Sequence, residues 1–271
     1  MNRPPPPKVL SIAGSDSGGG AGIQADLKAF ARCGVHGMTA ITAITVQNTT
    51  EVRAVHPIPP EFITAQVAAV VDDIGVDAVK IGMLGDLATI AAVERALDLL
   101  PAGTPVVLDP VMVAESGAVL LAEDARAALA ERIVPRARVV TPNIAEARVL
   151  TGLPEADGEE LAVAVHRLGP FAAVVTGGHA ESGTDWYFDG SGPAPAAIRG
   201  ERFEDGASHG SGCTHSSTLA ARLAHGAEPL EAARLAREAA ARAVRDGLRD
   251  VGEGAGPVDV LGVRTAEGRL T

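Results

Sequence analysis

The chain has few of the residues that build metal clusters, disulfide frameworks or basic surfaces. Only two cysteines, Cys33 and Cys213, occur in 271 residues, with no paired spacing for zinc. The formal net charge of -11 and the lack of a long basic run argue against a nucleic-acid partner. No apolar run reaches the ~18 residues that span a membrane, and no secretory leader is recognisable. We therefore expect a reduced, cytoplasmic protein that binds neither membrane nor nucleic acid.

Lysine is also scarce, because only Lys8, Lys28 and Lys80 occur among 23 basic residues. The acidic surface repels anions, so an anionic ligand must be held by local devices such as helix N-termini. This requirement directs attention to the glycine-rich segments of the chain.

Apolar strand-like runs alternate with helical patterns along most of the chain. The runs cover residues 9–14, 38–46, 77–82, 106–111, 139–143 and 172–178, and an antiparallel strand is expected at 185–189. Helices are predicted at 60–73, 86–100, from 144, at 159–168 and at 229–248, the last with Leu230, Ala233, Ala240, Val244 and Leu248 on one stripe. We predict an α/β fold with a mostly parallel central sheet flanked by helices on both faces, and a ligand site beyond the carboxyl ends of the strands.

Residues 1–8 are expected to be a flexible, proline-rich N-terminus, and residues 9–271 one domain. The glycine loop at 14–22 follows the first strand, but it lacks the G-x-G-x-x-G spacing of a dinucleotide site. A nicotinamide cofactor is therefore excluded.

The segment at 209–217 (HGSGCTHSS) is the strongest candidate for an active-site element. A helix is predicted to begin near Cys213, so Gly210, Ser211, Gly212 and Cys213 offer free backbone N–H groups to an anion such as phosphate. The positive end of the helix is expected to lower the pKa of the Cys213 thiol, which would then work as a base or proton relay.

Together the motifs resemble the bacterial hydroxymethylpyrimidine/phosphomethylpyrimidine kinases of thiamine biosynthesis, in the ribokinase-like superfamily. The resemblance rests on residues 13–28 (AGSDSGGGAGIQADLK), 40–49 (AITAITVQNT), 79–84 (VKIGML), 108–113 (LDPVMV), 141–143 (TPN) with Glu146, 177–179 (GGH) and 209–214 (HGSGCT). It implies a ribokinase-like fold and an ATP-dependent kinase that phosphorylates 4-amino-5-hydroxymethyl-2-methylpyrimidine and then its monophosphate. It also implies ATP and Mg²⁺ as cofactors, and we expect a homodimer.

The resemblance assigns a role to each candidate residue. Gly210, Ser211, Gly212 and Cys213 would be catalytic. The pyrimidine would be bound by Gly14, Asp26, Gln47, Met83 and Val111, with Asp16 assisting, and ATP by Asn143, Thr176 and Gly178. Glu146 and Asp109 would serve the metal. Taken alone, the pair Asn143 and Glu146 favours a helix N-cap with a first-turn acid over a metal site. For the loop histidines, His179 and His209, structural roles are expected.

Two positions depart from the family pattern, because Thr176 and Glu115 stand where lysines are usual. Three functions therefore stay open. The first is a pyrimidine kinase with rearranged phosphate binding. The second is a pyridoxal-type or pyridoxamine-type kinase, which the contexts of Gln47 and Met83 disfavour. The third is a pyrimidine-binding protein with weak catalysis.

Overall fold

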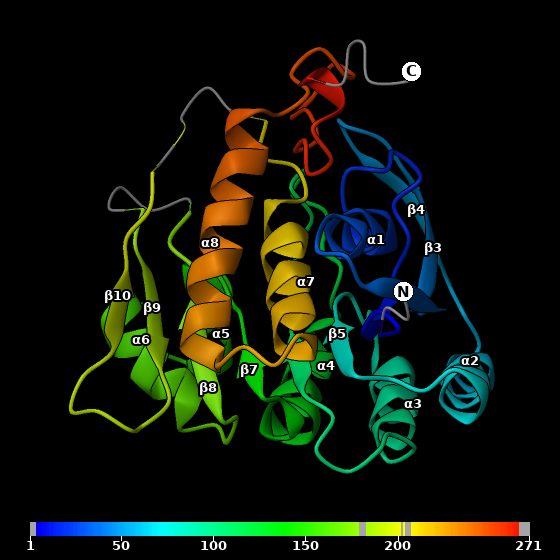
Figure 1. Ribbon diagram of the computed structural model, residues 1–271, viewed down its shortest axis with the longest axis horizontal. Coiled ribbons are helices and arrows are strands. Elements are labelled where there is room, and N and C mark those ends of the chain that lie inside the picture. Colours follow the sequence, from blue (N-terminus) through cyan, green and yellow to red (C-terminus); the bar gives the residue numbers. More distant parts are fainter. Residues whose placement is uncertain (1–3, 179–182, 202, 204–206, 266–271) are drawn as a thin grey trace.

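The central sheet has the predicted parallel character. The computed structural model describes residues 4–178, 183–201, 203 and 207–265. Within these residues, eight strands form one sheet in the order β10-β9-β8-β7-β6-β5-β1-β2 (Figure 1). Their bounds are β1 (Lys8–Ala13), β2 (His36–Ile41), β5 (Ala78–Ile81), β6 (Val106–Leu108), β7 (Val139–Val140), β8 (Ala172–Val175), β9 (Asp185–Phe188) and β10 (Ala196–Ile198). Six neighbouring strands pair in parallel, in the order β2, β1, β5, β6, β7 and β8. The last two strands, β9 and β10, pair antiparallel, as predicted for residues 185–189.

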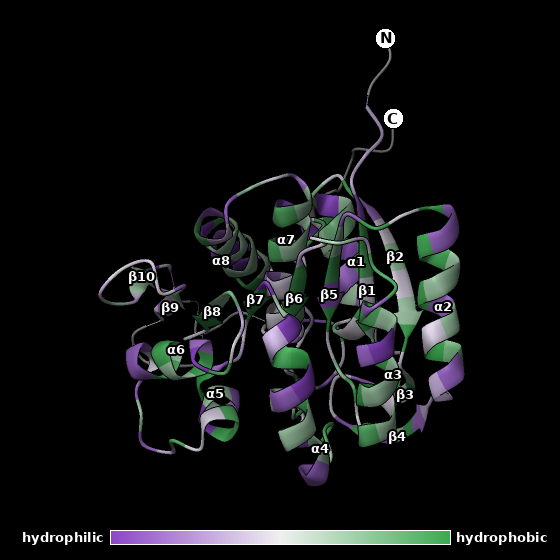
Figure 2. Ribbon diagram, turned by 90° about the horizontal axis from the view of Figure 1, so that it is seen from below, coloured by the Kyte–Doolittle hydropathy of each residue, from purple (hydrophilic) through white to green (hydrophobic). Residues whose placement is uncertain are grey.

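Helices cover both faces of this sheet, so the predicted fold class is confirmed (Figure 2). One face carries α1 (Gly22–Arg32), α7 (Ser211–Ala224) and α8 (Pro229–Arg245), and the other carries α2 (Pro60–Asp73), α3 (Leu87–Leu97), α4 (Glu123–Ala128), α5 (Ile144–Thr151) and α6 (Gly158–His166). Short turns of π-helix (Leu129–Ile133) and 3-10 helix (Val134–Arg136 and Val263–Thr265) complete the helical elements.

The strands are buried on both sides, which explains their almost continuous apolar runs. Successive residues of a strand point to opposite faces, so Leu10 and Val79 pack under α2 and α3, while Val9 and Ala78 pack under α1 and α7. The two apolar layers hold the strand ends, and the loops that follow them, in place.

The prediction of one buried strand over residues 38–46 is wrong. The chain breaks at Thr42, whose hydroxyl donates to the Met83 carbonyl (2.7 Å) and whose carbonyl accepts from the Ile58 N–H (2.9 Å). After Thr42, β3 (Ala43–Gln47) leaves the sheet and pairs with β4 (Val52–Pro57), a strand that the sequence pattern did not reveal. Ile44 and Val46 are about half exposed (49% and 54%) on this hairpin. An apolar β-branched run therefore supplied both a core strand and an exposed hairpin strand.

Most predicted helices occur with shifted ends. The helix at 60–73 has the predicted bounds, whereas α3 ends at Leu97 and α8 at Arg245, short of the predicted residues 100 and 248. The buried face of α8 includes Ala233 and Ala240 as predicted, and Leu230 packs partly buried against the core. Its other buried residues are Pro229, Ala232, Ala236, Arg237 and Ala243.

The N-terminal boundary also shifts, because Lys8 already belongs to β1 and its N–H donates to Asp77 Oδ2 (2.8 Å). Within the described residues, no helix is both long and apolar enough to cross a membrane. The assignment of residues 9–271 to one domain stays a prediction.

Candidate active site

A cleft lies beyond the carboxyl ends of the parallel strands, against the N-terminus of α7. It brings together nearly all of the predicted site residues, namely Gly14, Gln47, Met83, Asp109, Val111, Asn143, Glu146, Thr176, Gly178, Gly210, Ser211, Gly212 and Cys213. This is the location expected for a ligand site in a parallel α/β sheet. Asp26 is the predicted residue that does not line the cleft.

The first turn of α7 forms the floor of the cleft. The helix begins at Ser211, two residues before the predicted start, and Gly210 caps it with a left-handed backbone (φ 85). A Cβ on Gly210 would lie 1.8 Å from the Gly20 carbonyl oxygen, so a glycine is required where the two glycine-rich loops meet. Thr214 N–H bonds the Gly210 carbonyl and Ser211 N–H bonds the Ser208 carbonyl. Among the described residues, the N–H groups of Gly212 and Cys213 remain for an anion.

The predicted lowering of the Cys213 pKa is wrong. Burial raises the pKa of the thiol to about 12, and although Lys80 acts to lower it, Asp26 and Asp109 add to the increase. The helix terminus and one cation are outweighed by the low-polarity surroundings and two carboxylates. Cys213 is therefore a neutral thiol at neutral pH.

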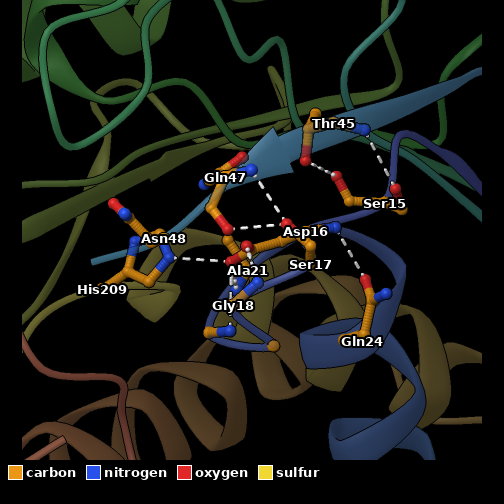
Figure 3. A network of polar contacts seen from close by, with 12 residues as sticks. Ser15, Asp16, Ser17, Gly18, Ala21, Gln24, Thr45, Gln47, Asn48 and His209 are labelled. Carbon is orange, nitrogen blue, oxygen red and sulfur yellow. Dashed lines mark hydrogen bonds and ion pairs between the residues drawn. The ribbon is translucent and has the colours of Figure 1, made fainter. Parts of the chain in front are cut away.

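Asp16 organises the N-terminal glycine loop. Its carboxylate accepts from the N–H groups of Gly18 (2.8 Å), Gly20 (3.0 Å) and Ala21 (2.8 Å), and lies 2.9 Å from His209 Nε2 (Figure 3). Burial acts to raise the pKa of Asp16, but the bonds from His209 and the backbone hold it below its ordinary value. Because both carboxylate oxygens already accept hydrogen bonds from the protein, Asp16 shapes the cleft and has little capacity left to bind a substrate. The structural role predicted for His209 matches this contact, whereas His179 lies outside the described residues.

A buried charge cluster lies beneath the cleft and includes a residue that the sequence reasoning missed. Lys80 is fully buried, with its Nζ 2.9 Å from Asp26 Oδ1 and 3.9 Å from Asp109 Oδ2. The shorter contact has the distance of an ion pair but not the direction of a hydrogen bond. Burial acts to lower the pKa of Lys80, yet Asp26, Cys213 and Asp109 raise it above its ordinary value, so the amine is charged. A lone lysine inside an apolar strand was the signal available in the sequence.

The same cluster fixes α7 to the sheet. Ser217 Oγ donates to Asp26 (2.6 Å) and Ser216 Oγ donates to Asp109 (2.9 Å), while Ser11 Oγ donates to the second oxygen of Asp26 (2.5 Å). Asp26 is thus saturated by buried partners, and its predicted contact with the pyrimidine is not supported by its position. Its role is to hold the first turns of α7 where they face the cleft.

Asn143 and Glu146 form the capping box that begins α5. Asn143 Oδ1 accepts from the Glu146 N–H (2.9 Å), and Glu146 Oε2 accepts from the Asn143 N–H (3.0 Å). Burial, and then the nearby Asp109, raise the pKa of Glu146 to about 8. Burial also raises the pKa of Asp109, although Lys80 and Ser216 oppose the change. A divalent cation bound by these two groups would favour their ionised form, in which carboxylate oxygens are its usual ligands. Among the described residues, no group of three metal-ligating side chains occurs, so the remaining ligands would come from water or a bound phosphate.

The acceptor end of the cleft has an apolar wall and one amide. A Cβ on Gly14 would come within 2.8 Å of the Met83 methyl carbon, so this glycine lets the thioether approach the strand end. The backbone of Gln47 exchanges bonds with Ser17 Oγ (2.6 and 2.8 Å), which ties the hairpin to the glycine loop. Gln47 therefore lines the cleft on a backbone that Ser17 holds in place.

Thr176 and Glu115, the two positions without the usual lysine, both line the cleft. Thr176 Oγ1 donates weakly to the Pro142 carbonyl (3.4 Å), and Glu115 Oε1 accepts from Ser208 Oγ (2.8 Å). Gly177 follows, and its N–H donates to Asp185 Oδ1 (2.9 Å). A Cβ on Gly177 would lie 2.1 Å from the Thr184 carbonyl oxygen, so the turn after β8 is held by backbone contacts.

The family model for phosphomethylpyrimidine kinase matches residues 16–259 of the chain. The chain belongs to this family. A hydroxymethylpyrimidine/phosphomethylpyrimidine kinase of Rhizobium meliloti is 47% identical, over 92% of this chain and 95% of that protein.

Solved structures agree with the phosphomethylpyrimidine kinase assignment at the level of fold. An ADP complex of Bacillus subtilis pyridoxal kinase superposes with a TM-score of 0.85 at 38% identity, covering 96% of this chain and 99% of that one. A phosphomethylpyrimidine kinase of Clostridium difficile gives a TM-score of 0.75 at 36% identity, covering 85% and 96%. The ribokinase-like fold is confirmed, and the protein is an ATP-dependent small-molecule kinase.

Proposed function

We propose that the chain transfers the γ-phosphoryl group of ATP to the hydroxymethyl group of 4-amino-5-hydroxymethyl-2-methylpyrimidine, and then phosphorylates the resulting monophosphate. The observation that carries this proposal is the position of the α7 N-terminus. Gly212 and Cys213, in the first turn of this helix, line the same cleft as Gly14, Met83 and Gln47. The names of the curated relatives support the same substrates.

Phosphoryl transfer requires mainly positioning and stabilisation of the negative charge on the transferred group. The N–H groups of Gly212 and Cys213 would bind the oxygens of that group, and a donor of this kind contributes ~10²–10³ in rate. The Cys213 thiol, protonated because its pKa is about 12, would orient the acceptor hydroxyl and relay its proton, accepting the hydroxyl proton as it passes its own proton to an oxygen of the transferred phosphoryl group. A strong base is not needed, because the transition state is loose and the hydroxyl loses its proton late.

We also propose Mg²⁺ as the metal, with Glu146 and Asp109 as the residues that would hold it. Their buried carboxylates are hard oxygen ligands, and Mg²⁺ commonly completes its shell with water and substrate phosphates. When bound, the ion would neutralise charge on the phosphates. Lys80, 3.9 Å from Asp109 Oδ2, limits the negative charge that remains when the ion is absent. Asn143, Thr176 and Gly178 would border the ATP phosphates.

A pyridoxal-type kinase is the second candidate function. It is favoured by the likeness to pyridoxal kinase of Bacillus subtilis. The Gln47 amide argues for the pyrimidine, because an amide offers one donor and one acceptor side by side. An aminopyrimidine edge presents the complementary pair, whereas pyridoxal does not.

An ADP-release assay with three acceptor conditions, the hydroxymethylpyrimidine, pyridoxal and no acceptor, tests these alternatives. ADP production that depends on the hydroxymethylpyrimidine, with a total of two equivalents of ADP released per equivalent of pyrimidine, would support the proposal. Faster turnover with pyridoxal would favour the second candidate. If neither acceptor stimulates ADP release, the remaining alternative is a pyrimidine-binding protein with weak catalysis. Calorimetric titration with the pyrimidine would then detect the binding.

The expected homodimer and cytoplasmic location remain predictions. Ile44 and Val46 are exposed on one face of the β3–β4 hairpin, which is consistent with burial of this face against a second copy of the chain. Sedimentation analysis of the wild type and of Val46→Lys, which places a charge on this surface, tests that prediction.

A further inference from the structure

The cleft has an unfavourable charge for a nucleotide. Its described lining contains five acidic side chains, those of Asp16, Asp109, Glu115, Glu146 and Asp185, of which Glu146 is largely neutral without a bound cation because its pKa is about 8. The same lining contains two permanently charged cations, Lys80 and Arg237. The protein as a whole carries a formal charge of -11. A polyphosphate therefore needs a local cation, because the surrounding field opposes its approach.

Lys80 is not available for that purpose. It is fully buried between Asp26 and Asp109 at 2.9 and 3.9 Å, and both carboxylates would lose their compensating charge if it turned away. Arg237 is the other permanent cation in the described lining.

Arg237 extends from α8 to the turn that follows β8. Its side chain is nine-tenths buried. Nη2 donates to the Gly183 carbonyl at 2.5 Å, and Nη1 lies 3.9 Å from Asp185 Oδ1, which is too long for a hydrogen bond. Nη1 also lies 3.8 Å from the position that a Cβ on Gly178 would take. Nε has no partner among the described residues, so a guanidinium with five N–H donors has one hydrogen-bond acceptor, the Gly183 carbonyl, in this part of the chain.

Further unpartnered polar atoms surround the guanidinium. Asp185 Oδ2 and both ring nitrogens of His215 have no hydrogen bond within the described part of the chain, although all three are buried. His215 Nε2 and Asp185 Oδ2 are 3.7 Å apart. Burial lowers the pKa of His215, with Arg237 adding to the decrease and Asp185 opposing it, so the ring is neutral at neutral pH. Buried groups of this kind are normally paired with protein or water, and their concentration at one end of the cleft indicates a place for a polar ligand.

We propose that Arg237 binds the polyphosphate of the nucleotide beside Gly178, and that Asp185 is a positioning residue that orients both the guanidinium and the Gly177 N–H. The proposal rests on the proposed kinase function and deepens it. A planar guanidinium binds two phosphate oxygens at once, and at this site it offsets the excess of carboxylates. Gly178 is exposed and lines the cleft, and its Cβ position lies 3.8 Å from Nη1, so a phosphate beside Gly178 would be within reach of the guanidinium.

Calorimetric titration with ADP and with adenosine, without metal or acceptor, tests the proposal. Arg237→Met keeps most of the length of the side chain and removes its charge, so ADP should bind ~10–100-fold more weakly, the amount expected for one or two charge-assisted bonds. Adenosine lacks phosphates, and its affinity should change less than about twofold. Arg237→Lys retains a positive charge but lacks the planar guanidinium, so its ADP affinity should lie between those of the wild type and Arg237→Met.

Arg234→Met is the matched control. Arg234 lies one turn earlier on α8, and its side chain is 55% exposed beside Glu231 at 3.9 Å. The ADP affinity of Arg234→Met should equal that of the wild type. Steady-state kinetics should show a higher KM for ATP in Arg237→Met, with the KM for the pyrimidine nearly unchanged.

Three outcomes would overturn the proposal. Equal ADP affinity in the wild type and Arg237→Met would reduce Arg237 to a structural residue. Equal losses for ADP and adenosine would show that the substitution disturbs the cleft as a whole. If Arg237→Met does not fold, ADP binding by Arg237→Lys at the wild-type level would refute the phosphate contact. Absence of ADP binding by the wild-type protein would instead contradict the proposed kinase function itself.

Discussion

Replacing Lys80 by methionine removes the cation from the buried cluster while retaining most of the volume of its side chain. Asp26 and Asp109 would then share a buried region with no compensating charge. Removing one partner of a buried ion pair typically costs ~3–5 kcal/mol of unfolding free energy. For a domain of this size each kcal/mol lowers Tm by ~2–4 °C, so a decrease of roughly 10 °C is expected.

Lys8 offers a matched control for the same substitution. Its Nζ lies 3.7 Å from Asp77, but these side chains are 30% and 41% exposed. A pair in contact with water contributes ~0–1 kcal/mol, so Lys8→Met should lower Tm by only a few degrees at most. Thermal unfolding of the two variants under identical conditions isolates the effect of burial.

The double variant Asp26→Asn/Lys80→Met tests the electrostatic explanation. The side-chain amide introduced by Asp26→Asn is neutral, so this substitution removes one of the carboxylates that Lys80→Met leaves without a compensating charge. We expect the double variant to be more stable than the sum of the single effects by ~1–3 kcal/mol. Additive effects, or equal changes in Tm for Lys80→Met and Lys8→Met, would refute the interpretation of the cluster as a coupled ion network.

Three further predictions concern the cleft. Cys213→Ala should lower turnover by ~10²–10⁴ while pyrimidine binding changes little, and wild-type turnover would remove the thiol from the catalytic residues. Asp16→Asn should cost ~1–3 kcal/mol in urea unfolding, because an amide nitrogen cannot accept the bonds now made to the carboxylate. Since the pKa of Asp16 is below its ordinary value of 3.8, this difference should be complete at neutral pH and shrink as the pH falls below about 4, and a constant difference would contradict the assignment. Gln47→Glu should weaken pyrimidine binding by ~1–3 kcal/mol and pyridoxal binding much less, whereas equal losses in calorimetry would mean that Gln47 supports only the shape of the cleft.

The sequence predicted the layers of the fold well, because alternating apolar runs and helical stripes are local patterns. It failed at residues 38–46, where the β-branched run continues but the sheet does not. The break depends on the bonds of Thr42 to Met83 and Ile58, which are distant in the sequence and leave no local pattern.

The site residues show the same division between local and distant causes. Their position after strands predicted which residues gather at the cleft, and the spacing of Asn143 and Glu146 predicted the helix cap. Asp26 was misassigned because it lies on the buried side of α1 with Ile23 and Phe30, where a carboxylate needs internal partners. The raised pKa of Cys213 follows from burial and from the charges of Asp26 and Asp109, which the helix terminus alone does not indicate.

The bonds that close the cleft join the two ends of the chain. His209 reaches Asp16 across 193 positions, and Ser217 reaches Asp26 across 191. During synthesis at ~5–20 residues per second, the first glycine loop waits roughly 10–40 s for the segment that completes it. A nascent chain can form β1 to β8 and the apolar layer beneath α2 to α6 in that interval, but the layer on the other face stays incomplete because α7 and α8 do not yet exist. Activity therefore begins only when the C-terminal quarter has left the ribosome and packed, and a chain released early has no assembled cleft with which to hydrolyse ATP.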